Sequence, residues 1–202
     1  MLSLEPMDIT GPLKWALPPS KSQMIRWLVL SSQSSDSVSI RFSEKPGKDV
    51  SSMADCLELL GTVIDRKEGE WIVSGVGEEG FRTPQQTLDC GNSGTSARFL
   101  MAIAAGMREE IRIDGDESLR CRDMSVIAGA LRDLGCFVSG DTLPVTVSGP
   151  LQIDSAELEL SSSSQPLSAI LLASPGFPFP IKLEIVGSSV SRGYYELSLI
   201  HI

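Results

Sequence analysis

The sequence contains few of the residues from which metal sites and catalytic triads are usually built. Only one of its 202 residues is a histidine, His201, and its four cysteines form no CxxC pair. A histidine metal site, a Ser-His-Asp triad and a zinc site are therefore disfavoured. We expect the cysteines to be reduced, half-buried thiols of a cytosolic protein rather than a disulfide framework: Cys56, Cys90, Cys121 and Cys136.

Long apolar runs and an excess of positive charge are also missing. No stretch reaches the roughly 18 apolar residues of a membrane span, and the first residues do not resemble a signal peptide. With 17 basic and 26 acidic residues the net charge is −9, which disfavours general binding to nucleic acid. We therefore expect a cytoplasmic protein without nucleic-acid or membrane partners. Any anion site must be a local concentration of positive charge.

The sequence does contain an internal repeat. Residues 57–75 recur 74 residues later as 131–149, with Leu-Gly and Val-Ser-Gly at matching positions. Each copy predicts a helix that ends at glycine, followed by two strands of alternating apolar residues. Before these copies, SKSQMIRWLVLSS and NSGTSARFLMAIAAG both pass from small polar residues into an apolar helix, and SSSQPLSAILLASPG does so a third time.

Each unit is therefore predicted to run strand, helix, strand, helix, strand, strand. The second helices of the first two units are expected over residues 49–60 and 123–134. The third unit is incomplete, because its Leu-Gly turn and last strand would fall beyond Ile202. A repeat unit that stops in mid-helix leaves apolar surface uncovered, so we expect the sequence to be the front part of a longer polypeptide.

The openings of the predicted helices concentrate positive charge. Lys21 and Arg26 lie in the first opening, Arg98 ends GNSGTSAR in the second, and GDESLRCRD places Arg120 and Arg122 just before a further helix. Helix N-termini bind anions through free N–H groups, and lysine and arginine add charged contacts. Convergence of these openings on one face would suit a small ligand with more than one anionic group. Taken singly, GNSG remains compatible with an ordinary turn and SSSSQ with a flexible loop.

In combination these segments resemble the 5-enolpyruvylshikimate-3-phosphate (EPSP) synthase family. PSKSQMIR, GNSGTSARFL, GDESLRCRDM, SSSSQPLSAILL and SVSRGYYELSL occur in the family's order and spacing over nearly the whole chain. The resemblance implies an α+β fold of two domains, each with three βαβαββ units around a pseudo-threefold axis. It implies transfer of the enolpyruvyl group from phosphoenolpyruvate to the 5-hydroxyl of shikimate 3-phosphate, with release of phosphate, in chorismate biosynthesis. It further implies a monomer at full length, with no metal or cofactor.

The resemblance also implies roles for residues of this sequence. Lys21 would be catalytic and touch both substrates, and Gln165 would lie near both. The residues expected to hold shikimate 3-phosphate are, in addition, Ser22, Arg26, Ser163, Ser164, Ser191 and Tyr194. Those expected to hold phosphoenolpyruvate or to shape its loop are Asn92, Gly94, Thr95, Arg98 and Arg122.

Three positions depart from the family pattern, and the length does too. Asp123 and Gly193 replace usual prolines, and Pro166 replaces a usual aromatic residue. Asp123 adds a negative charge beside Arg122, which would weaken its grip on phosphoenolpyruvate. The family is roughly twice as long, at the usual scale of two domains. Residues 1–16 would be a strand of the second domain and 17–202 a truncated first domain, so the second domain and the expected general base would be absent.

Two other functions stay open from the residues. A sister enzyme on the same fold transfers enolpyruvate to UDP-N-acetylglucosamine, but Lys21, Ser22 and Arg26 together with Ser163 and its neighbours favour the shikimate substrate. A non-catalytic anion-binding module would retain only the ligand-binding half of the fold.

Overall fold

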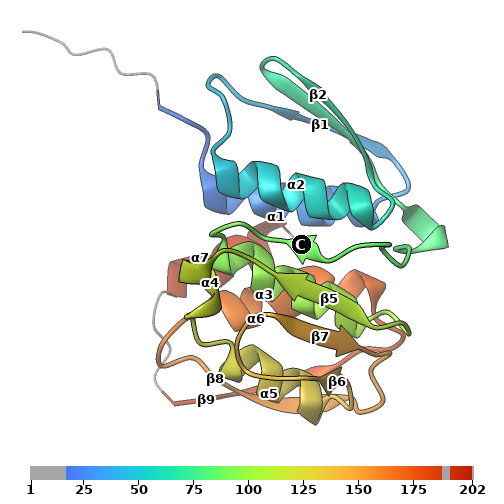
Figure 1. Cartoon of the computed structure of the whole chain (residues 1–202), viewed down its shortest axis with the longest axis vertical. Helices are drawn as coiled ribbons and strands as arrows, with labels where there is room; N and C mark the ends of the chain where they lie inside the picture. The colour runs from blue at the N-terminus through green and yellow to red at the C-terminus, as the bar shows by residue number, and fades with distance from the viewer. Residues whose placement is uncertain (1–16, 188–191, 202) are drawn as a thin grey trace, which may run out of the picture.

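The computed structural model describes residues 17–187 and 192–201. The strand expected within residues 1–16 lies outside the described residues. The remainder forms an α+β fold of three successive units, as the internal repeat predicts, and each unit packs helices against its own small sheet (Figure 1).

The first unit alternates helices and strands and ends in a hairpin. Its strands form one antiparallel sheet in the order β1-β3-β2, with Val38 opposite Val73 and Val73 opposite Ile64. Apolar residues alternate along β3, so Trp71 and Val73 are buried while their neighbours are half exposed. The elements are α1 (Lys21–Gln33), β1 (Ser37–Arg41), α2 (Lys48–Leu59), β2 (Val63–Lys67) and β3 (Glu70–Ser74).

The second unit repeats this plan with three additions, of which one is the strand β4 before its first long helix. A 3₁₀ turn, η1 (Gly77–Glu79), leads into it, and a short helix precedes its second long helix. Its sheet has the order β4-β5-β7-β6, in which β4 and β5 are parallel and the other pairs antiparallel. The elements are β4 (Leu88–Asp89), α3 (Gly94–Ala105), β5 (Ile111–Asp114), α4 (Glu117–Arg120), α5 (Ser125–Asp133), β6 (Phe137–Val138) and β7 (Val145–Ser148).

The third unit has the parallel strand pair and both helices. Strands β8 and β9 pair in parallel, as β4 and β5 do. Beside them an apolar groove of about 740 Å³ separates α6, β9 and α7, with Leu167, Ile170 and Ile185 among its lining residues. The elements are β8 (Ser155–Glu159), α6 (Gln165–Ala173), the 3₁₀ turn η2 (Ser174–Gly176), β9 (Lys182–Val186) and α7 (Arg192–His201).

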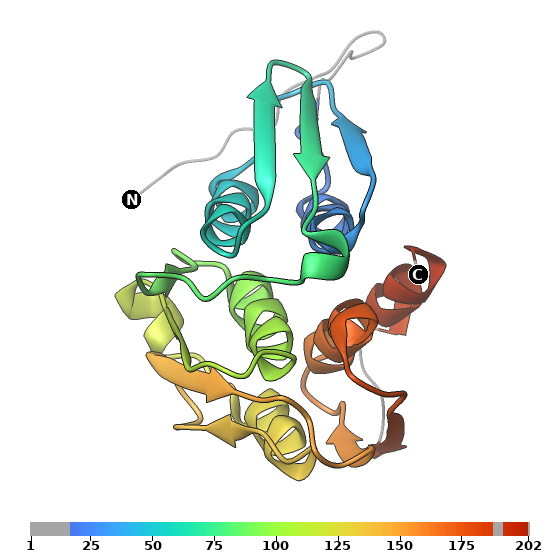
Figure 2. The ribbon, with the colours of Figure 1, turned by 90° about the vertical axis from the view of Figure 1, so that its right-hand side faces the viewer.

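The helices lie inside and the sheets outside. Figure 2 looks along the helices and shows the three sheets at the periphery, with α1, α3 and α6 toward the middle. Helix α3 packs against α6, and α1 contacts both α2 and α6. Ten of the twelve residues of α3 are buried, and the two that are not are Thr95 and Arg98. Helix α3 is thus apolar nearly all round, and its polar residues lie in its N-terminal half.

Close backbone contacts explain why the repeated Val-Ser-Gly ends in glycine. A Cβ on Gly75 would lie 2.3 Å from the Ser31 carbonyl oxygen, and one on Gly149 would lie 1.9 Å from that of Ala105. No side chain fits at such distances, so each glycine lets the end of a strand meet the end of its unit's first long helix, α1 or α3. The sequence repeat therefore reproduces one packing contact in two units.

Two expectations need correction. The helix predicted over 123–134 begins only at Ser125. Met124 is its N-cap, and Asp123 before it forms a local turn, in which its carboxylate accepts from the Ser125 backbone N–H at 2.8 Å. Arg122 consequently lies in the turn between α4 and α5 rather than directly at a helix start. The cysteines are free as expected, but they are not half-buried, since Cys121 is exposed and the other three are buried.

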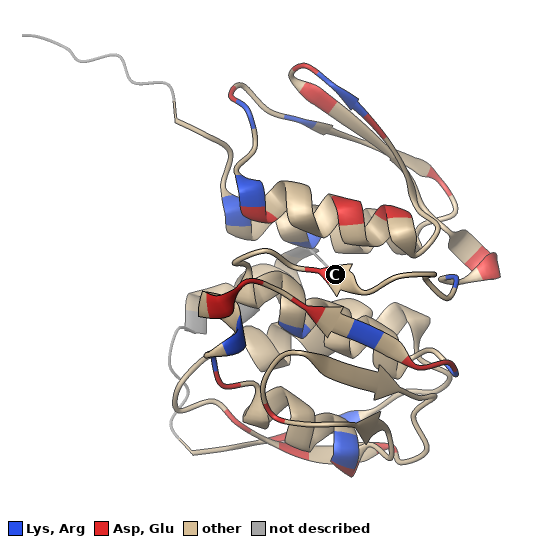
Figure 3. Cartoon of the chain, in the orientation of Figure 1, with Lys and Arg blue, Asp and Glu red and all other residues tan. Residues whose placement is uncertain are grey.

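Charged positions are interspersed, as Figure 3 shows along the ribbon. Among the described residues, no helix has the length and hydropathy to cross a bilayer. In the same part of the chain, no group of three or more histidine, cysteine or acidic side chains is placed to hold a metal ion.

Candidate active site

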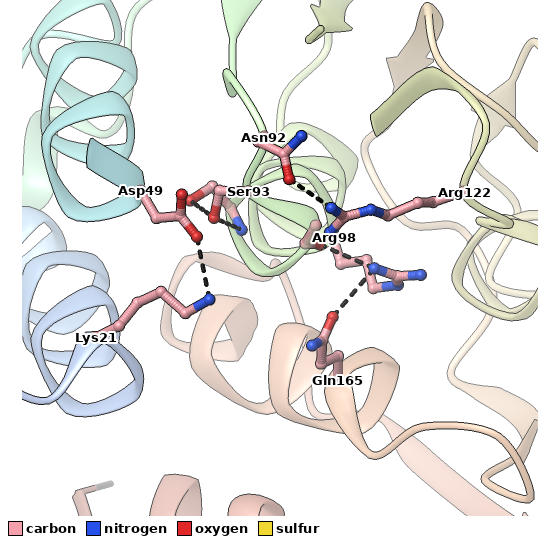
Figure 4. A network of polar contacts seen from close by, with 9 residues as sticks. Lys21, Asp49, Asn92, Ser93, Arg98, Arg122 and Gln165 are labelled. Carbon is pink, nitrogen blue, oxygen red and sulfur yellow. Dashed lines mark hydrogen bonds and ion pairs between the residues drawn. The ribbon is translucent and has the colours of Figure 1, made fainter. Parts of the chain in front are cut away.

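The openings of α1, α3 and α6 meet in one region, together with the start of α2 (Figure 4). Serine hydroxyls order all three turns. Ser20 Oγ accepts from the Gln23 backbone N–H, Ser93 Oγ from that of Ser96, and Ser163 Oγ from that of Gln165. Several N–H groups of each first turn still lack an intrahelical partner, as at every helix start. The region therefore has the backbone donors of an anion site, as the sequence predicts.

Two guanidinium groups lie over the opening of α3. A Cβ on Gly94, the first residue of α3, would lie 2.9 Å from Arg98 Nη1 and 3.3 Å from Arg122 Nη1. Glycine therefore leaves the space that both cations approach. An anion here would meet two charges and a helix N-terminus at once, which is a favourable arrangement for phosphate or carboxylate.

Arg98 connects three elements at this site. Its Nη1 donates to the Gly94 carbonyl and to Gln165 Oε1, both at 3.0 Å, and its Nη2 donates to the Asp123 carbonyl at 2.7 Å. Burial lowers the pKa of the Arg98 guanidinium, and the nearby Arg122 lowers it further, against the opposing effect of Asp123. Because Arg98 binds the amide oxygen of Gln165, the amide NH₂ of Gln165 remains as a donor.

The side chain of Arg122 is held in place by Asn92. Arg122 Nη2 donates to Asn92 Oδ1, and Asn92 Nδ2 donates to both carboxylate oxygens of Asp116, at 3.0 and 2.8 Å. The hydrogen bonds that Asp116 accepts, first from Asn92 and then from the Leu119 backbone N–H, hold the pKa of Asp116 below its usual range. Arg120, two residues before Arg122, is paired elsewhere, with both oxygens of Asp114.

Lys21 joins the openings of α1 and α2. Its ammonium group forms an ion pair with Asp49 at 3.0 Å, and the lysine side chain is 54% exposed. Asp49 lies in the first turn of α2, where a carboxylate is favoured by the helix dipole. Lys21 therefore stands at the edge of the site with two of its three N–H donors available for a ligand.

Arg26 differs from the expectation of a cation on the open face. Arg26 is 2% exposed, and its side chain extends from α1 to contact α6 and α7. Its guanidinium donates to Ser168 Oγ and Ser198 Oγ and to the carbonyls of Ser22 and Tyr194, all at 2.8–3.0 Å. Burial lowers its pKa. In this arrangement four of its five N–H donors are used within the chain, so Arg26 fastens α7.

The other expected residues fall into three groups. Ser22, Ser163 and Thr95 are half-buried at the helix openings. Ser164 is buried, at 2% exposure, while Tyr194 is 53% exposed on α7. Ser191 lies outside the described residues.

The three departures from the family pattern have local explanations where the structure offers one. Asp123 turns its carboxylate to Ser125 rather than to Arg122, which counters the expectation that it weakens Arg122. Pro166 is buried in the first turn of α6, where a missing N–H costs little. Gly193 lies on α7 with nothing near its Cβ position, and nothing in the structure explains it.

Sequence reasoning did not identify Asp49 and Asp116 as members of the site. Both lie at helix starts, where an acidic residue already has a local explanation. Their partners, Lys21 and Asn92, lie 28 and 24 residues away along the chain. No local pattern reports pairs of that separation.

Comparisons with known proteins identify a family for the chain. The family model of EPSP synthase (3-phosphoshikimate 1-carboxyvinyltransferase) matches residues 5–194. The 3-phosphoshikimate 1-carboxyvinyltransferase of Nitrobacter hamburgensis is 38% identical over 167 residues, covering 77% of this chain and 36% of the relative. That of a Bradyrhizobium species is 36% identical over 200 residues, covering 95% of this chain and 44% of the relative.

Solved structures show the same fold. EPSP synthase from Acinetobacter baumannii superposes with a TM-score of 0.76 at 28% identity, covering 90% of this chain and 42% of that one. The enolpyruvyl transferase NikO from Streptomyces tendae shares the fold at a TM-score of 0.61 and 20% identity, with 89% and 42% covered. The chain thus spans less than half the length of the relatives it matches. On the family match and on these identities, it belongs to the EPSP synthase family.

Proposed function

We propose that this chain provides the first-domain part of an enzyme that transfers the enolpyruvyl group of phosphoenolpyruvate to the 5-hydroxyl of shikimate 3-phosphate. The observation that supports this most directly is the pair of guanidinium groups over the glycine that opens α3. In phosphoenolpyruvate the phosphoryl group is bonded to the enol oxygen, and the carboxylate is bonded to the carbon atom that carries this oxygen. Two anionic groups therefore lie close together. Such a ligand needs clustered, preorganised donors, and the three helix openings supply them.

For phosphoenolpyruvate, we propose that Arg122, Lys21 and the backbone at Gly94 contact the ligand. The amide NH₂ of Gln165 would donate to it, because Arg98 already occupies the amide oxygen. Asn92, Thr95 and Arg98 would shape the loop around it. The atom of the Arg122 side chain that lies nearest Gly94 is Nη1. Among the described residues, Arg122 donates to Asn92 through Nη2, and Nη1 has no hydrogen-bond partner.

For shikimate 3-phosphate, the supporting groups lie at the other two openings. Lys21 and Ser22 open α1, and Ser163, Ser164 and Gln165 open α6. Tyr194 on α7 and Ser191 would complete the pocket. Arg26 could contribute only if α7 released some of the donors that it occupies here.

The reaction needs charge stabilisation more than covalent help from the protein. The 5-hydroxyl oxygen adds to C2 of phosphoenolpyruvate while C3 gains a proton, and loss of phosphate and of a proton from C3 then restores the double bond. Phosphate is the leaving group, so cations beside its oxygens favour the elimination. We propose Lys21 as the chain's catalytic residue, with the base for the 5-hydroxyl supplied from elsewhere in the enzyme. No metal or cofactor enters this proposal.

Substitution of the two neighbouring arginines tests the proposal. Arg122→Ala removes a charged hydrogen-bond donor and should weaken phosphoenolpyruvate binding by about ten- to a hundredfold. Arg120→Ala is the matched control, because Arg120 is paired with both carboxylate oxygens of Asp114 and makes no contact with Asn92 among the hydrogen bonds of the described residues. Calorimetric titration with phosphoenolpyruvate, in the presence of shikimate 3-phosphate, measures both. A larger loss in Arg120→Ala than in Arg122→Ala would contradict the proposed site.

A further inference from the structure

We infer that Asp116 is a positioning residue, which fixes the Asn92 amide so that its oxygen holds Arg122 beside the opening of α3. Asp116 contacts no proposed ligand, and its effect is transmitted by Asn92. The inference rests on the proposed function for the role of Arg122, but the ordering of Arg122 by Asp116 can be tested without it.

The two loops that bear Asp116 and Asn92 are fixed to each other by their backbones. The Cys90 N–H donates to the Asp114 carbonyl and the Asp116 N–H donates to the Gly91 carbonyl, both at 2.9 Å. A Cβ on Gly115 would lie 2.6 Å from the Gly91 carbonyl oxygen, so the loops approach as closely as glycine permits. The spacing between the two side chains is therefore set by the fold.

Chemistry then selects the orientation of the Asn92 amide. A carboxylate only accepts hydrogen bonds and a guanidinium only donates them. Asn92 lies between one of each, so its NH₂ must face Asp116 and its oxygen must face Arg122. A flipped amide would set two acceptors together on one side and two donors on the other. The ionised state of Asp116 is what makes this choice unambiguous.

Arg122 depends on this contact more than a helical arginine would. It lies in the turn between α4 and α5, where its backbone N–H donates to the Leu119 carbonyl. Its side chain is long and exposed, so without Asn92 it would sample many rotamers. Ordering one such side chain in advance lowers the cost of binding a ligand.

Asp116→Asn separates this role from capping. Asp116 Oδ1 also accepts from the Leu119 backbone N–H as the N-cap of α4, and asparagine caps as well as aspartate. The NH₂ group that this substitution introduces would, however, face the NH₂ of Asn92. Asn92 would lose the shorter of its two acceptor contacts, and a flip that pairs its oxygen with the new NH₂ would turn its own NH₂ toward Arg122 and so release it. The double variant Asn92→Asp/Asp116→Asn exchanges the two residues. It gives Arg122 a carboxylate acceptor at position 92, and the NH₂ group at position 116 can donate to that same carboxylate.

The test follows the Arg122 Nε–Hε signal by NMR relaxation in the 202-residue chain, assigned by its loss in Arg122→Lys. Asp116→Asn and Asn92→Ala should each make this group more mobile, and the double exchange should restore its order. Glu117→Gln, which removes a neighbouring exposed charge outside the network, should leave it unchanged. The Arg120 signal is an internal reference, since its Nε donates to Asp114.

Affinity gives the second readout. Phosphoenolpyruvate should bind roughly three- to tenfold more weakly to Asp116→Asn and Asn92→Ala, the range expected for ordering one long side chain. An Arg122 signal as ordered in Asn92→Ala as in the unaltered chain would overturn the inference, and that variant retains the α4 cap. If the unaltered chain showed no response to phosphoenolpyruvate, the role proposed for Arg122 would fail, while its mobility would still decide the role of Asp116.

Discussion

At the scale of single residues, the arginines near the helix openings have three different roles. Arg98 joins α3, α6 and the turn before α5, Arg122 faces the opening of α3, and Arg26 is buried against α7. The sequence predicts that all three gather near the openings, because the repeat aligns Arg26 with Arg98 and Arg122 comes just before a further predicted helix. It cannot say that Arg26 turns inward, because its partners Ser168 and Ser198 are 142 and 172 residues away.

The burial of Arg26 predicts a large effect on stability. Arg26→Ala removes four hydrogen bonds to a charged group and leaves Ser168 and Ser198 without that partner. We expect the free energy of unfolding to fall by about 2–4 kcal/mol. Urea denaturation measures this, with Arg41→Ala as a control on an exposed ion pair. Equal midpoints for the two variants would show that Arg26 does not fasten α7.

Gly94 predicts the opposite pattern, an effect on binding without a loss of stability. In Gly94→Ala the new Cβ would press on the ends of the Arg98 and Arg122 side chains, at 2.9 and 3.3 Å. Both can move aside, and alanine is a better helix residue than glycine, so unfolding should be unchanged or slightly harder. Phosphoenolpyruvate should bind more weakly, by roughly tenfold or more. Calorimetry and thermal melts of the same sample check both parts; a drop in melting temperature with unchanged affinity would contradict them.

At the scale of elements, the sequence repeat reflects a packing contact between the end of a strand and the end of a helix. The Gly149 N–H donates to the Met107 carbonyl beyond α3, and the Val76 N–H donates to the Ser32 carbonyl of α1. In each of the first two units, the strand that leaves the sheet thus meets the end of that unit's first long helix next to a glycine. This is why Val-Ser-Gly could be recognised as a repeat from sequence. The short helix α4 could not, because its four residues, ESLR, show no helical period.

These contacts predict contrasting effects of alanine at two glycines. Gly149→Ala would place a Cβ 1.9 Å from the Ala105 carbonyl oxygen, a backbone atom that cannot rotate away. We expect a loss of about 3 kcal/mol in the free energy of unfolding. Gly129→Ala, within α5 and with nothing near its Cβ position, should instead gain about 0.5–1 kcal/mol. Denaturant titration compares them, and similar stabilities would contradict the packing described here.

At the scale of the whole molecule, the sequence predicts the convergence of the helix openings but not the acids that meet there. Three units of one plan must bring equivalent elements to equivalent places, so the openings of α1, α3 and α6 share a region. The pairs Lys21–Asp49 and Asn92–Asp116 arise between different elements of this arrangement. These pairs depend on the distances between elements in the folded chain, and the length of a sequence repeat does not specify those distances.

The state of those acids leads to a prediction about activity. Three carboxylates beside the proposed ligand-binding residues are already acceptors: Asp49 pairs with Lys21, Asp116 with Asn92, and Asp123 with Ser125. Their hydrogen bonds hold the pKa values of Asp116 and Asp123 below the usual range, which makes both weaker bases. The described residues therefore lack a suitable base for the 5-hydroxyl.

We accordingly expect the 202-residue chain alone to release no phosphate from phosphoenolpyruvate and shikimate 3-phosphate, although it should bind shikimate 3-phosphate weakly. A phosphate-release assay with the purified chain checks the first part and calorimetry the second. Supplying the remaining domain of an EPSP synthase as a separate polypeptide should then produce turnover, because catalysis needs both ligands oriented together and a base within reach. Turnover by the chain alone would mean that one of the three carboxylates leaves its partner to act as the base. Asp49→Asn would then be the first variant to assay, since Asp49 alone among them is paired with a residue proposed to touch both substrates.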